Sequence, residues 1–151
     1  MLLWPGAGSD AEHPGLRAVE AGVAPLRVAR RDFPYRREGR RAPDRAPKLM
    51  AAVRAEVDEL CSRWGTGPEH LVLGGRSMGG RICSMVAAGA DGEGPLPVAG
   101  LVMMSYPLHP PGRPDRLRTE HLPQLRVPVL FISGDRDTFG TPEELAEAQA
   151  L

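Results

Sequence analysis

The sequence predicts an α/β protein built as a three-layer sandwich with a mostly parallel central sheet. Two apolar runs, residues 98–105 and 127–133, are nearly continuous, which is typical of strands covered on both faces. Segments with helical periodicity alternate with the strand-like segments along the chain. A glycine-rich turn also joins a third apolar segment directly to a helix-compatible stretch. These observations together predict parallel strands connected by helices.

The first half of the chain supplies two predicted strands and two predicted helices. Residues 1–4 form a short apolar strand, which a Pro/Gly-rich loop over 5–10 and a helix over 14–21 follow. Residues 26–29 are a weaker strand candidate because arginines flank them. Over 44–64, apolar residues recur every three or four positions, which predicts an amphipathic helix.

The second half continues this alternation. A strand over 70–74 leads through the glycine-rich turn into a helix-compatible stretch over 81–88, and Gly89 is suited to end that helix. The two long apolar runs then supply the last two strands. Between them, residues 106–126 are irregular and proline-rich, with a turn or two of helix expected around 117–122.

The last predicted element begins with a capping box. Thr141 stands at the N-cap, Pro142 at the first helical position and Glu144 at the third, which is a strong signal for a helix start. The helix pattern continues to Leu151 without a stop signal. We therefore expect one domain over residues 1–151 that is cut short in this helix.

Composition indicates a globular protein of balanced charge. Hydrophobic residues make up 42% and charged residues 25%, and the formal net charge of zero argues against nucleic-acid binding. There is no membrane-length apolar run and no signal-peptide pattern, so we expect a cytoplasmic protein that does not bind membranes. Cys61 and Cys83 have no spacing partner, which predicts buried or half-buried thiols and neither a metal nor another cofactor.

The strongest functional signal is the GxSxG motif from Gly75 to Gly79, which lies between an apolar strand and a helix. In a nucleophile elbow, a sharp strand-to-helix turn projects the serine hydroxyl above the sheet, and the flanking glycines let neighbouring backbones approach. The alternative is an ordinary glycine-rich turn with an incidental serine. We predict that Ser77 is a nucleophile.

Two further groups would complete the chemistry of such a serine. Asp137 follows a predicted strand, where an acid that orients the catalytic base is expected, whereas Asp135 is interpreted as a turn residue or an arginine partner. Both aspartates could instead simply shape the loop. The backbone N–H of Met78 and that of the loop Gly6-Ala7-Gly8 are candidate oxyanion donors, although that loop could be only a glycine-rich turn.

A general base is harder to assign, because no histidine follows Asp137 in the 151 residues. His70 is expected at the far end of the sheet and His121 at the surface. His13 is expected to flank the first helix near the candidate oxyanion loop. His109 follows a strand end and is a candidate substrate contact or, less readily, a replacement base.

An arginine-rich segment supplies another candidate for substrate binding. Residues 27–45 hold eight arginines, and the simpler interpretation is a solvated loop that leads into the long helix. The alternative is that Tyr35, Arg36 and Arg37 overhang the pocket and bind an anionic group, since the guanidinium fork suits carboxylates and phosphates.

Taken together, these residues resemble the α/β-hydrolase superfamily, in its dienelactone-hydrolase-like branch. Within it, the chain is most similar to a small bacterial family that shares a domain with a subunit of the nonspecific-lethal histone acetyltransferase complex and with a testis-expressed protein. The segments that carry the resemblance span nearly the whole chain. They are Pro5-Gly6-Ala7-Gly8 with His13-Pro14, residues 32–36, 74–80, 105–110 and 134–142.

The resemblance implies a partial α/β-hydrolase fold in which the elbow strand is central, between the first strand and the strand over 98–105. It implies that Ser77 is the nucleophile and Asp137 the triad acid, with no cofactor. The implied oxyanion donors are Met78 and the Gly6-Ala7 region, and the candidate substrate-binding residues are His109, Tyr106, Arg76, Tyr35 and Arg36.

The resemblance also implies that the triad histidine would follow a further strand beyond Leu151 and that two strands would precede Met1. The chain therefore resembles a member truncated at both ends, which we expect to be inactive as it stands. The leading hypothesis is that the complete form hydrolyses an ester, lactone or thioester, a small-molecule acyl substrate, through a Ser77 acyl-enzyme. The alternative is a non-catalytic scaffold or interaction protein. Exposed strand edges would favour self-association.

Overall fold

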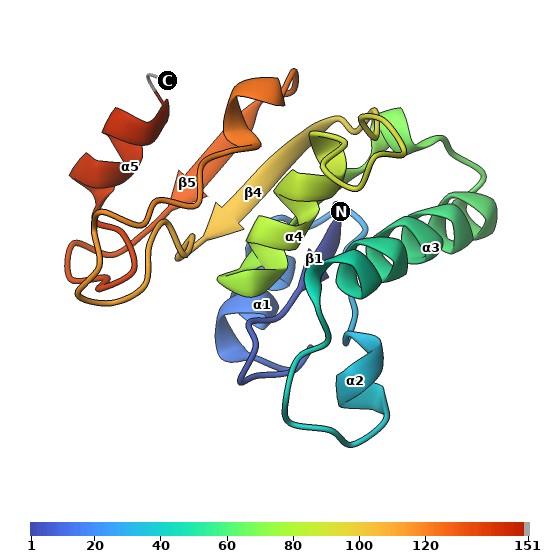
Figure 1. The fold of residues 1–151 in the computed structure, drawn as a ribbon. Helices are drawn as coiled ribbons and strands as arrows, with labels where there is room; N and C mark the ends of the chain where they lie inside the picture. Colours follow the sequence, from blue (N-terminus) through green and yellow to red (C-terminus); the bar gives the residue numbers. More distant parts are fainter. Residues whose placement is uncertain (150–151) are drawn as a thin grey trace.

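The computed structural model describes residues 1–149 as a five-stranded, all-parallel sheet with helices on both faces (Figure 1). The order of the strands is β2-β1-β3-β4-β5. Their bounds are β1 Leu2–Trp4, β2 Ala29–Arg30, β3 Val72–Arg76, β4 Gly100–Met104 and β5 Val129–Ile132. The predicted α/β architecture with a parallel sheet is confirmed, and the elbow strand β3 lies between β1 and β4 as the resemblance implied.

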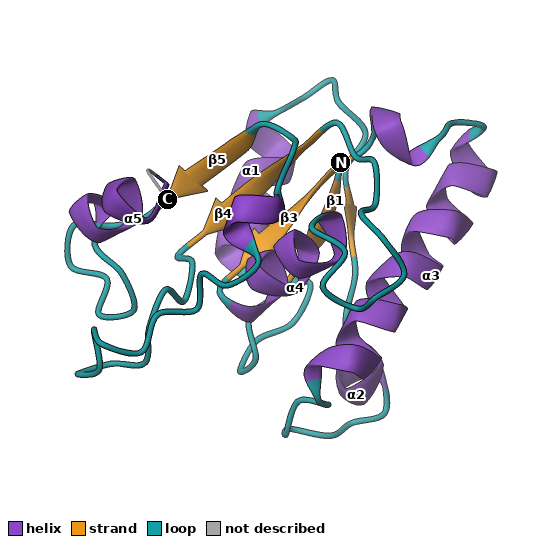
Figure 2. Cartoon of the chain, turned by 45° about the horizontal axis from the view of Figure 1, so that its top comes forward, coloured by secondary structure: helices purple, strands orange, loops and turns teal. Residues whose placement is uncertain are grey.

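The helices cover the two faces of this sheet unequally (Figure 2). Buried side chains of α3 and α4 pack with Leu2, Leu73 and Leu101 on one face. Leu16 of α1 packs with Leu3 and Met104 on the other. The helices are α1 Pro14–Gly22, α2 Pro34–Arg37, α3 Ala46–Trp64, α4 Met78–Ala87 and α5 Pro142–Gln149, and short 3-10 helices span Pro68–His70 and Leu122–Gln124.

Two local expectations are wrong, and one short helix was not predicted. The second strand is shifted from residues 26–29 to Ala29–Arg30, because Ala29 and the residue after β2, Arg31, donate their N–H groups to β1 and its flank, whereas Leu26 is 63% exposed. The short helix α2 was not predicted, although Pro34 stands at its first turn. Instead of helix around 117–122, the structure has only the short 3-10 helix Leu122–Gln124.

The capping box at the start of α5 is formed as predicted. The N–H of Thr141 donates to Glu144 Oε2 over 2.9 Å, and the N–H of Glu144 donates to Thr141 Oγ1 over 3.3 Å. Leu145 and Ala148 of this helix pack on the same side of the sheet as Met103. The continuation of the helix that the sequence predicts over residues 150–151 lies outside the described residues.

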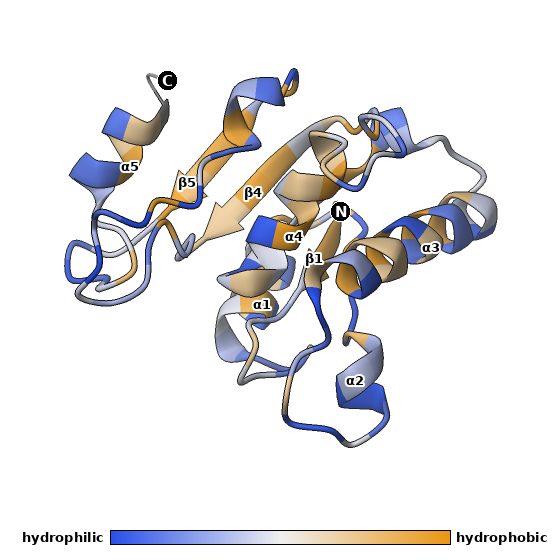
Figure 3. Ribbon diagram, viewed as in Figure 1, coloured by the Kyte–Doolittle hydropathy of each residue, from blue (hydrophilic) through white to orange (hydrophobic). Residues whose placement is uncertain are grey.

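The outer strand β5 exposes apolar side chains on one face. Val129 and Phe131 lie on the α5 side and are half-buried, whereas Leu130 and Ile132 point to the other face and are 55% and 46% exposed. The hydropathy colouring shows the apolar character of this strand (Figure 3). Within residues 1–149, no strand pairs with the outer edge of β5. Self-association through this edge stays a prediction.

In the part of the chain that the structure describes, no helix is long and apolar enough to span a membrane.

A buried carboxylate on α3 anchors the arginine-rich segment. Glu56 is only 6% exposed, and its two oxygens accept hydrogen bonds from Arg31 Nε and Arg37 Nη1, each over 2.8 Å. Removing one partner of such a buried ion pair destabilises a fold, because the remaining charge is left uncompensated. Glu59 lies on the same helix but forms an exposed pair with Arg63.

We therefore expect Glu56→Gln to lower the free energy of unfolding by about 1–3 kcal/mol, because the amide leaves two guanidinium groups without their carboxylate partner. The matched variant Glu59→Gln should change it by less than about 0.5 kcal/mol, since exposed ion pairs contribute little. Urea denaturation at neutral pH measures both values. Equal losses in the two variants would contradict a special role for Glu56.

Candidate active site

Ser77 occupies the single residue between the end of β3 and the start of α4. Its backbone is in an uncommon conformation for a residue with a side chain, with φ 50° and ψ −119°. Two hydrogen bonds hold it there: its N–H donates to the carbonyl of Met104 over 2.8 Å, and its carbonyl accepts from Arg81 N–H over 3.1 Å. The predicted sharp strand-to-helix turn is therefore present, with a half-buried serine at its apex.

Glycines let the backbones around this turn approach each other. A Cβ on Gly79 would lie 2.7 Å from the carbonyl oxygen of Pro5 and would also clash with that of Trp4. A Cβ on Gly75 would likewise clash with the carbonyl of Trp4. The absence of both side chains lets the end of β1 pack directly against β3 and the first turn of α4.

This packing brings the loop after β1 next to the serine. The Cβ position of Gly6 lies 3.5 Å from the Cβ of Ser77. Met78 opens α4, so its N–H belongs to the unpaired first turn of a helix, where the positive end of the helix dipole lies. Neither this N–H nor that of Ala7 has an acceptor among residues 1–149. The structure thus brings Gly6 next to Ser77, and the N–H groups of Ala7 and Met78, which adjoin these two residues in the chain, are free.

Tyr35 supports this loop from within the core. Its side chain is fully buried, and its hydroxyl donates to the carbonyl of Ala7 over 2.9 Å. Phe33 stacks between Tyr35 and Trp4, with ring centroids 6.3 Å and 4.5 Å away, respectively. Burial raises the pKa of the Tyr35 hydroxyl, so it remains a hydrogen-bond donor. The hypothesis that Tyr35 overhangs the pocket is wrong, because the ring lies under the loop.

The neighbouring arginines are also bound within the protein. Arg37 pairs with the buried Glu56, and Arg36 Nη2 lies 3.8 Å from Asp10 Oδ2 in the loop after β1. These contacts support the simpler interpretation of the arginine-rich segment, in which its side chains attach it to α3 and to the loop. Arg36 nevertheless remains beside the candidate site through Asp10.

Asp137 lies in the loop after β5, at the carboxyl edge of the same parallel sheet. Its side chain is half-buried, and Oδ1 accepts the N–H of Phe139 over 3.0 Å. Its own N–H donates to the carbonyl of Gly134 over 3.1 Å, so the loop is folded back on itself. Asp135 is exposed in the adjoining turn, as expected of a turn residue.

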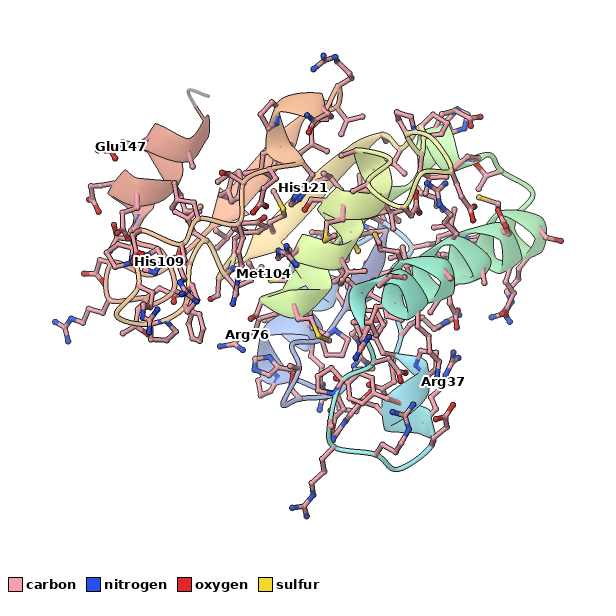
Figure 4. The ribbon with its side chains drawn as sticks, in the orientation of Figure 1. Arg37, Arg76, Met104, His109, His121 and Glu147 are labelled. Carbon is pink, nitrogen blue, oxygen red and sulfur yellow. The ribbon has the colours of Figure 1, made fainter. Side chains whose placement is uncertain are left out.

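Tyr106 and His109, both candidate substrate contacts, are buried in the segment after β4. Figure 4 labels His109 in this segment. The Tyr106 hydroxyl donates to the carbonyl of Arg118 over 2.8 Å, and burial raises its pKa to about 12. His109 is 6% exposed, with Nδ1 2.9 Å from the carbonyl of Pro110 and Nε2 3.4 Å from Glu144 Oε1. These contacts connect the segment to α5 and give both side chains structural roles.

The backbone of His109 also reaches the loop that carries Asp137. Its N–H donates to the carbonyl of Phe139 over 3.1 Å, and Ser133 Oγ donates to the carbonyl of Gly140 over 3.1 Å. The candidate acid is therefore held by contacts from both of the last two strand ends.

The other three histidines, His13, His70 and His121, contact residues other than Ser77. His13 caps α1 by accepting the N–H of Gly15 on Nδ1 over 3.0 Å, as its expected position before that helix allows. His70 is exposed before β3, at the amino end of the sheet. His121 was expected at the surface, but this is wrong: it is buried, and its Nε2 lies 2.7 Å from Ser84 Oγ. That hydrogen bond gives the buried Nε2 a polar partner and so offsets the loss of its contact with water.

The two thiols match their prediction. Cys61 is half-buried and Cys83 fully buried, where burial raises its pKa and the Sγ donates to the carbonyl of Gly74. Among residues 1–149, no group of three His, Cys, Asp or Glu side chains is arranged to hold a metal ion.

Comparison with known proteins identifies the family. The whole chain, residues 1–151, matches a family described as an alpha/beta hydrolase domain. Among solved structures, it is similar to wild-type AbyA5, with a TM-score of 0.66 and 15% sequence identity. The match covers 99% of this chain and 49% of AbyA5, so the chain spans about half the length of that protein. At this identity, the likeness concerns the fold alone.

The buried His121 gives the protein an acid-sensitive contact. Burial, and then the charge of Arg81, lower the pKa of His121 from 6.5 to about 4. The pKa of His121 is lower in the folded protein than in the unfolded chain. The contribution of the neutral ring to the free energy of unfolding is therefore fully present above about pH 6.5 and is lost as the pH falls towards 4.

We expect the urea midpoint of the protein to fall between pH 7 and pH 4.5, and His121→Gln to lose part of this dependence because it has no ionisable group. The matched variant His70→Gln removes an exposed histidine and should keep the full dependence. An unchanged pH dependence in His121→Gln would contradict the assignment.

Proposed function

The chain belongs to the alpha/beta hydrolase domain family, and from this premise we propose that Ser77 is the nucleophile of a hydrolase that cleaves carboxylic esters, lactones or thioesters. The observation that carries the proposal is the backbone of Ser77, with φ 50° at the junction of a parallel strand and a helix. Backbone strain of this kind persists only where surrounding structure holds it, and it concentrates at functional sites. Family membership and the two free N–H groups beside the hydroxyl support the same interpretation.

The chemistry would proceed in two steps. Ser77 Oγ forms a bond to the substrate carbonyl carbon, and the negative charge that develops on the carbonyl oxygen is stabilised by the N–H groups of Met78 and Ala7. Collapse of the tetrahedral intermediate breaks the bond to the alkoxide or thiolate and leaves an acyl-Ser77 ester. Water then attacks this ester, releases the acid and restores the hydroxyl.

The hydroxyl proton of Ser77 must pass to a base during the first step. We propose that Asp137 orients such a base, because it stands at the carboxyl edge of the sheet in a loop held by backbone hydrogen bonds. No histidine follows Asp137 in residues 1–151. A base supplied from solution should therefore increase the reactivity of Ser77.

A scaffold or interaction role is the second candidate. It is favoured by the places of the four histidines. His13 caps α1 and His70 stands at the amino end of the sheet, whereas His109 lies beside Glu144 and His121 bonds to Ser84. A fold without a base in reach of the serine would still offer the apolar face of β5 to a partner. Reactivity of Ser77 distinguishes the two functions.

We expect a neutral alkyl fluorophosphonate to label the wild-type protein at Ser77, with loss of fluoride and formation of a serine–phosphorus bond. Added imidazole should raise the labelling rate by about tenfold or more, because it takes up the hydroxyl proton. Mass spectrometry of the labelled peptide locates the adduct.

Ser77→Ala should abolish this labelling. Ser105→Ala is the matched control, since Ser105 also follows the end of a central strand and has a positive φ of 47°. It should retain the wild-type rate. Absence of labelling at every imidazole concentration, in a protein that unfolds cooperatively, would exclude the nucleophile and leave the scaffold role.

The tyrosine under the oxyanion loop offers a second test. Tyr35→Phe removes the hydrogen bond to Ala7, so we expect a loss of about 1 kcal/mol in stability and a slower labelling of Ser77. Tyr106→Phe removes a similar buried hydroxyl from the carbonyl of Arg118, and we expect a similar loss of stability with no change in labelling rate. Thermal unfolding and labelling kinetics measure the two effects. Equal labelling rates in both variants would contradict a role of Tyr35 in positioning the loop.

A further inference from the structure

Arg76 differs from most arginines of the chain in being half-buried without an internal partner. Of the 18 arginines, half donate a side-chain hydrogen bond or form an ion pair within the described residues. The others divide by exposure. Arg17, Arg27, Arg41, Arg45, Arg113, Arg116 and Arg136 are exposed to solvent, whereas Arg76 and Arg81 are half-buried.

A solvated guanidinium needs no protein partner, because water supplies its hydrogen bonds. A half-buried one loses part of that hydration, so an uncompensated charge there is costly. Such an arginine beside a candidate nucleophile can pair with an anionic group of a ligand, because the guanidinium fork matches a carboxylate. Arg76 and Arg81 therefore differ from the exposed arginines in having lost part of their hydration without gaining an ion-pair partner among residues 1–149.

The position of Arg76 connects it to the serine. It is the last residue of β3 and directly precedes Ser77, at the carboxyl edge of the sheet (Figure 4). Its Nη1 lies 3.6 Å from the Cβ position of Gly6, the same point that lies 3.5 Å from the Cβ of Ser77. The guanidinium therefore lies over the loop that holds one of the two candidate oxyanion donors.

The carboxylates of Asp10 and Asp32, which lie around this loop, contact groups other than Arg76. Asp10 Oδ1 accepts the N–H of Glu12, and its Oδ2 lies near Arg36. Asp32 Oδ1 accepts the N–H of Ala11 over 2.8 Å. None of them forms an ion pair with Arg76 in the described part of the chain.

Arg81 belongs to a different cluster. It lies one turn along α4, and its charge lowers the pKa of His121, after the larger effect of burial. It also lines a hollow with Glu120 and His121, on the side of the segment after β4. Of these two arginines, Arg76 is the one that lies against the loop after β1.

We propose that Arg76 binds a carboxylate on the acyl part of the substrate, so that the site selects acyl groups that carry a second, free acid. This inference rests on the proposed function of Ser77 and names its substrate class. The guanidinium fork can donate two parallel hydrogen bonds to a carboxylate, and partial burial strengthens that pairing. Arg36 and Tyr35, the residues that the sequence suggested for anion binding, are bound to Asp10 and Ala7 instead.

Two fluorophosphonates of equal chain length test the proposal, one ending in a carboxylate and the other in its methyl ester. We expect the wild-type protein, with imidazole present, to react at least about tenfold faster with the acidic probe, since one carboxylate–guanidinium pair supplies a difference of this size. Arg76→Gln should lower the rate with the acidic probe at least about tenfold more than the rate with the neutral probe, so that the preference is lost. Arg76→Lys keeps the charge and should retain part of the preference, which separates lost recognition from lost folding.

Arg17→Gln is the matched control, because it removes one positive charge from an exposed and unpaired arginine of α1. It should keep the full preference. A wild-type protein that reacts equally with both probes, or an Arg76→Gln variant that loses the same factor with both, would overturn the proposal while leaving Ser77 as the nucleophile.

Glutarate binding to Ser77→Ala, followed by NMR chemical shifts, tests the anion site at Arg76 without depending on Ser77 as a nucleophile. We expect this variant to bind glutarate, and the added change Arg76→Gln to weaken binding at least about tenfold. If neither probe labels any form but glutarate binding still depends on Arg76, the nucleophile is wrong and the anion site stands. If glutarate binds equally with and without Arg76, the anion site is wrong.

Discussion

The close approach of the end of β1 to the first turn of α4 is the constraint on which the rest of the site depends. Gly79 has no room for a side chain because the carbonyls of Trp4 and Pro5 occupy that space. The same approach sets the loop after β1 beside Ser77, and the N–H of Met78 has no acceptor among residues 1–149. The N–H of Ser77 donates to the carbonyl of Met104 and the N–H of Arg81 donates to the carbonyl of Ser77, and these two bonds hold the turn in its positive-φ conformation. One steric condition therefore places the half-buried serine at the turn and the loop after β1 beside it.

Several polar side chains of the protein, among them the candidate site residue Tyr35, have their hydrogen-bond or ion-pair partners inside the protein. The Tyr35 hydroxyl donates to the carbonyl of Ala7, Glu56 forms ion pairs with two arginines, and His121 forms a hydrogen bond with Ser84. Each contact connects segments that are distant in sequence, so each stabilises a loop against a helix or a strand. The groups left without such partners near the carboxyl edge of β3 are few, and Arg76 is the charged one beside the serine.

The β5 side of the sheet combines a well-connected loop with an uncovered surface. The loop that carries Asp137 is joined to the segment after β4 through the N–H of His109, and α5 begins with a complete capping box. On the opposite face of β5, Leu130 and Ile132 remain exposed. Within residues 1–149, β5 thus combines an edge that no strand pairs with and an exposed apolar face.

The sequence by itself determined the features that arise from local chemistry. Alternation of apolar runs with helical periodicity predicted the layers, the GxSxG motif predicted the turn at Ser77, and Thr141 with Glu144 predicted the start of α5. These signals are local because a glycine, a cap or an apolar period acts on its own neighbours. Tertiary structure alone decided the partners of the polar side chains. Whether Tyr35 lay over or under a loop, whether His121 was buried, and whether Arg37 or Arg76 stayed free depended on groups far away in the chain. Sequence spacing carries no signal for such contacts, since they form only when the sheet brings its strand ends to one edge.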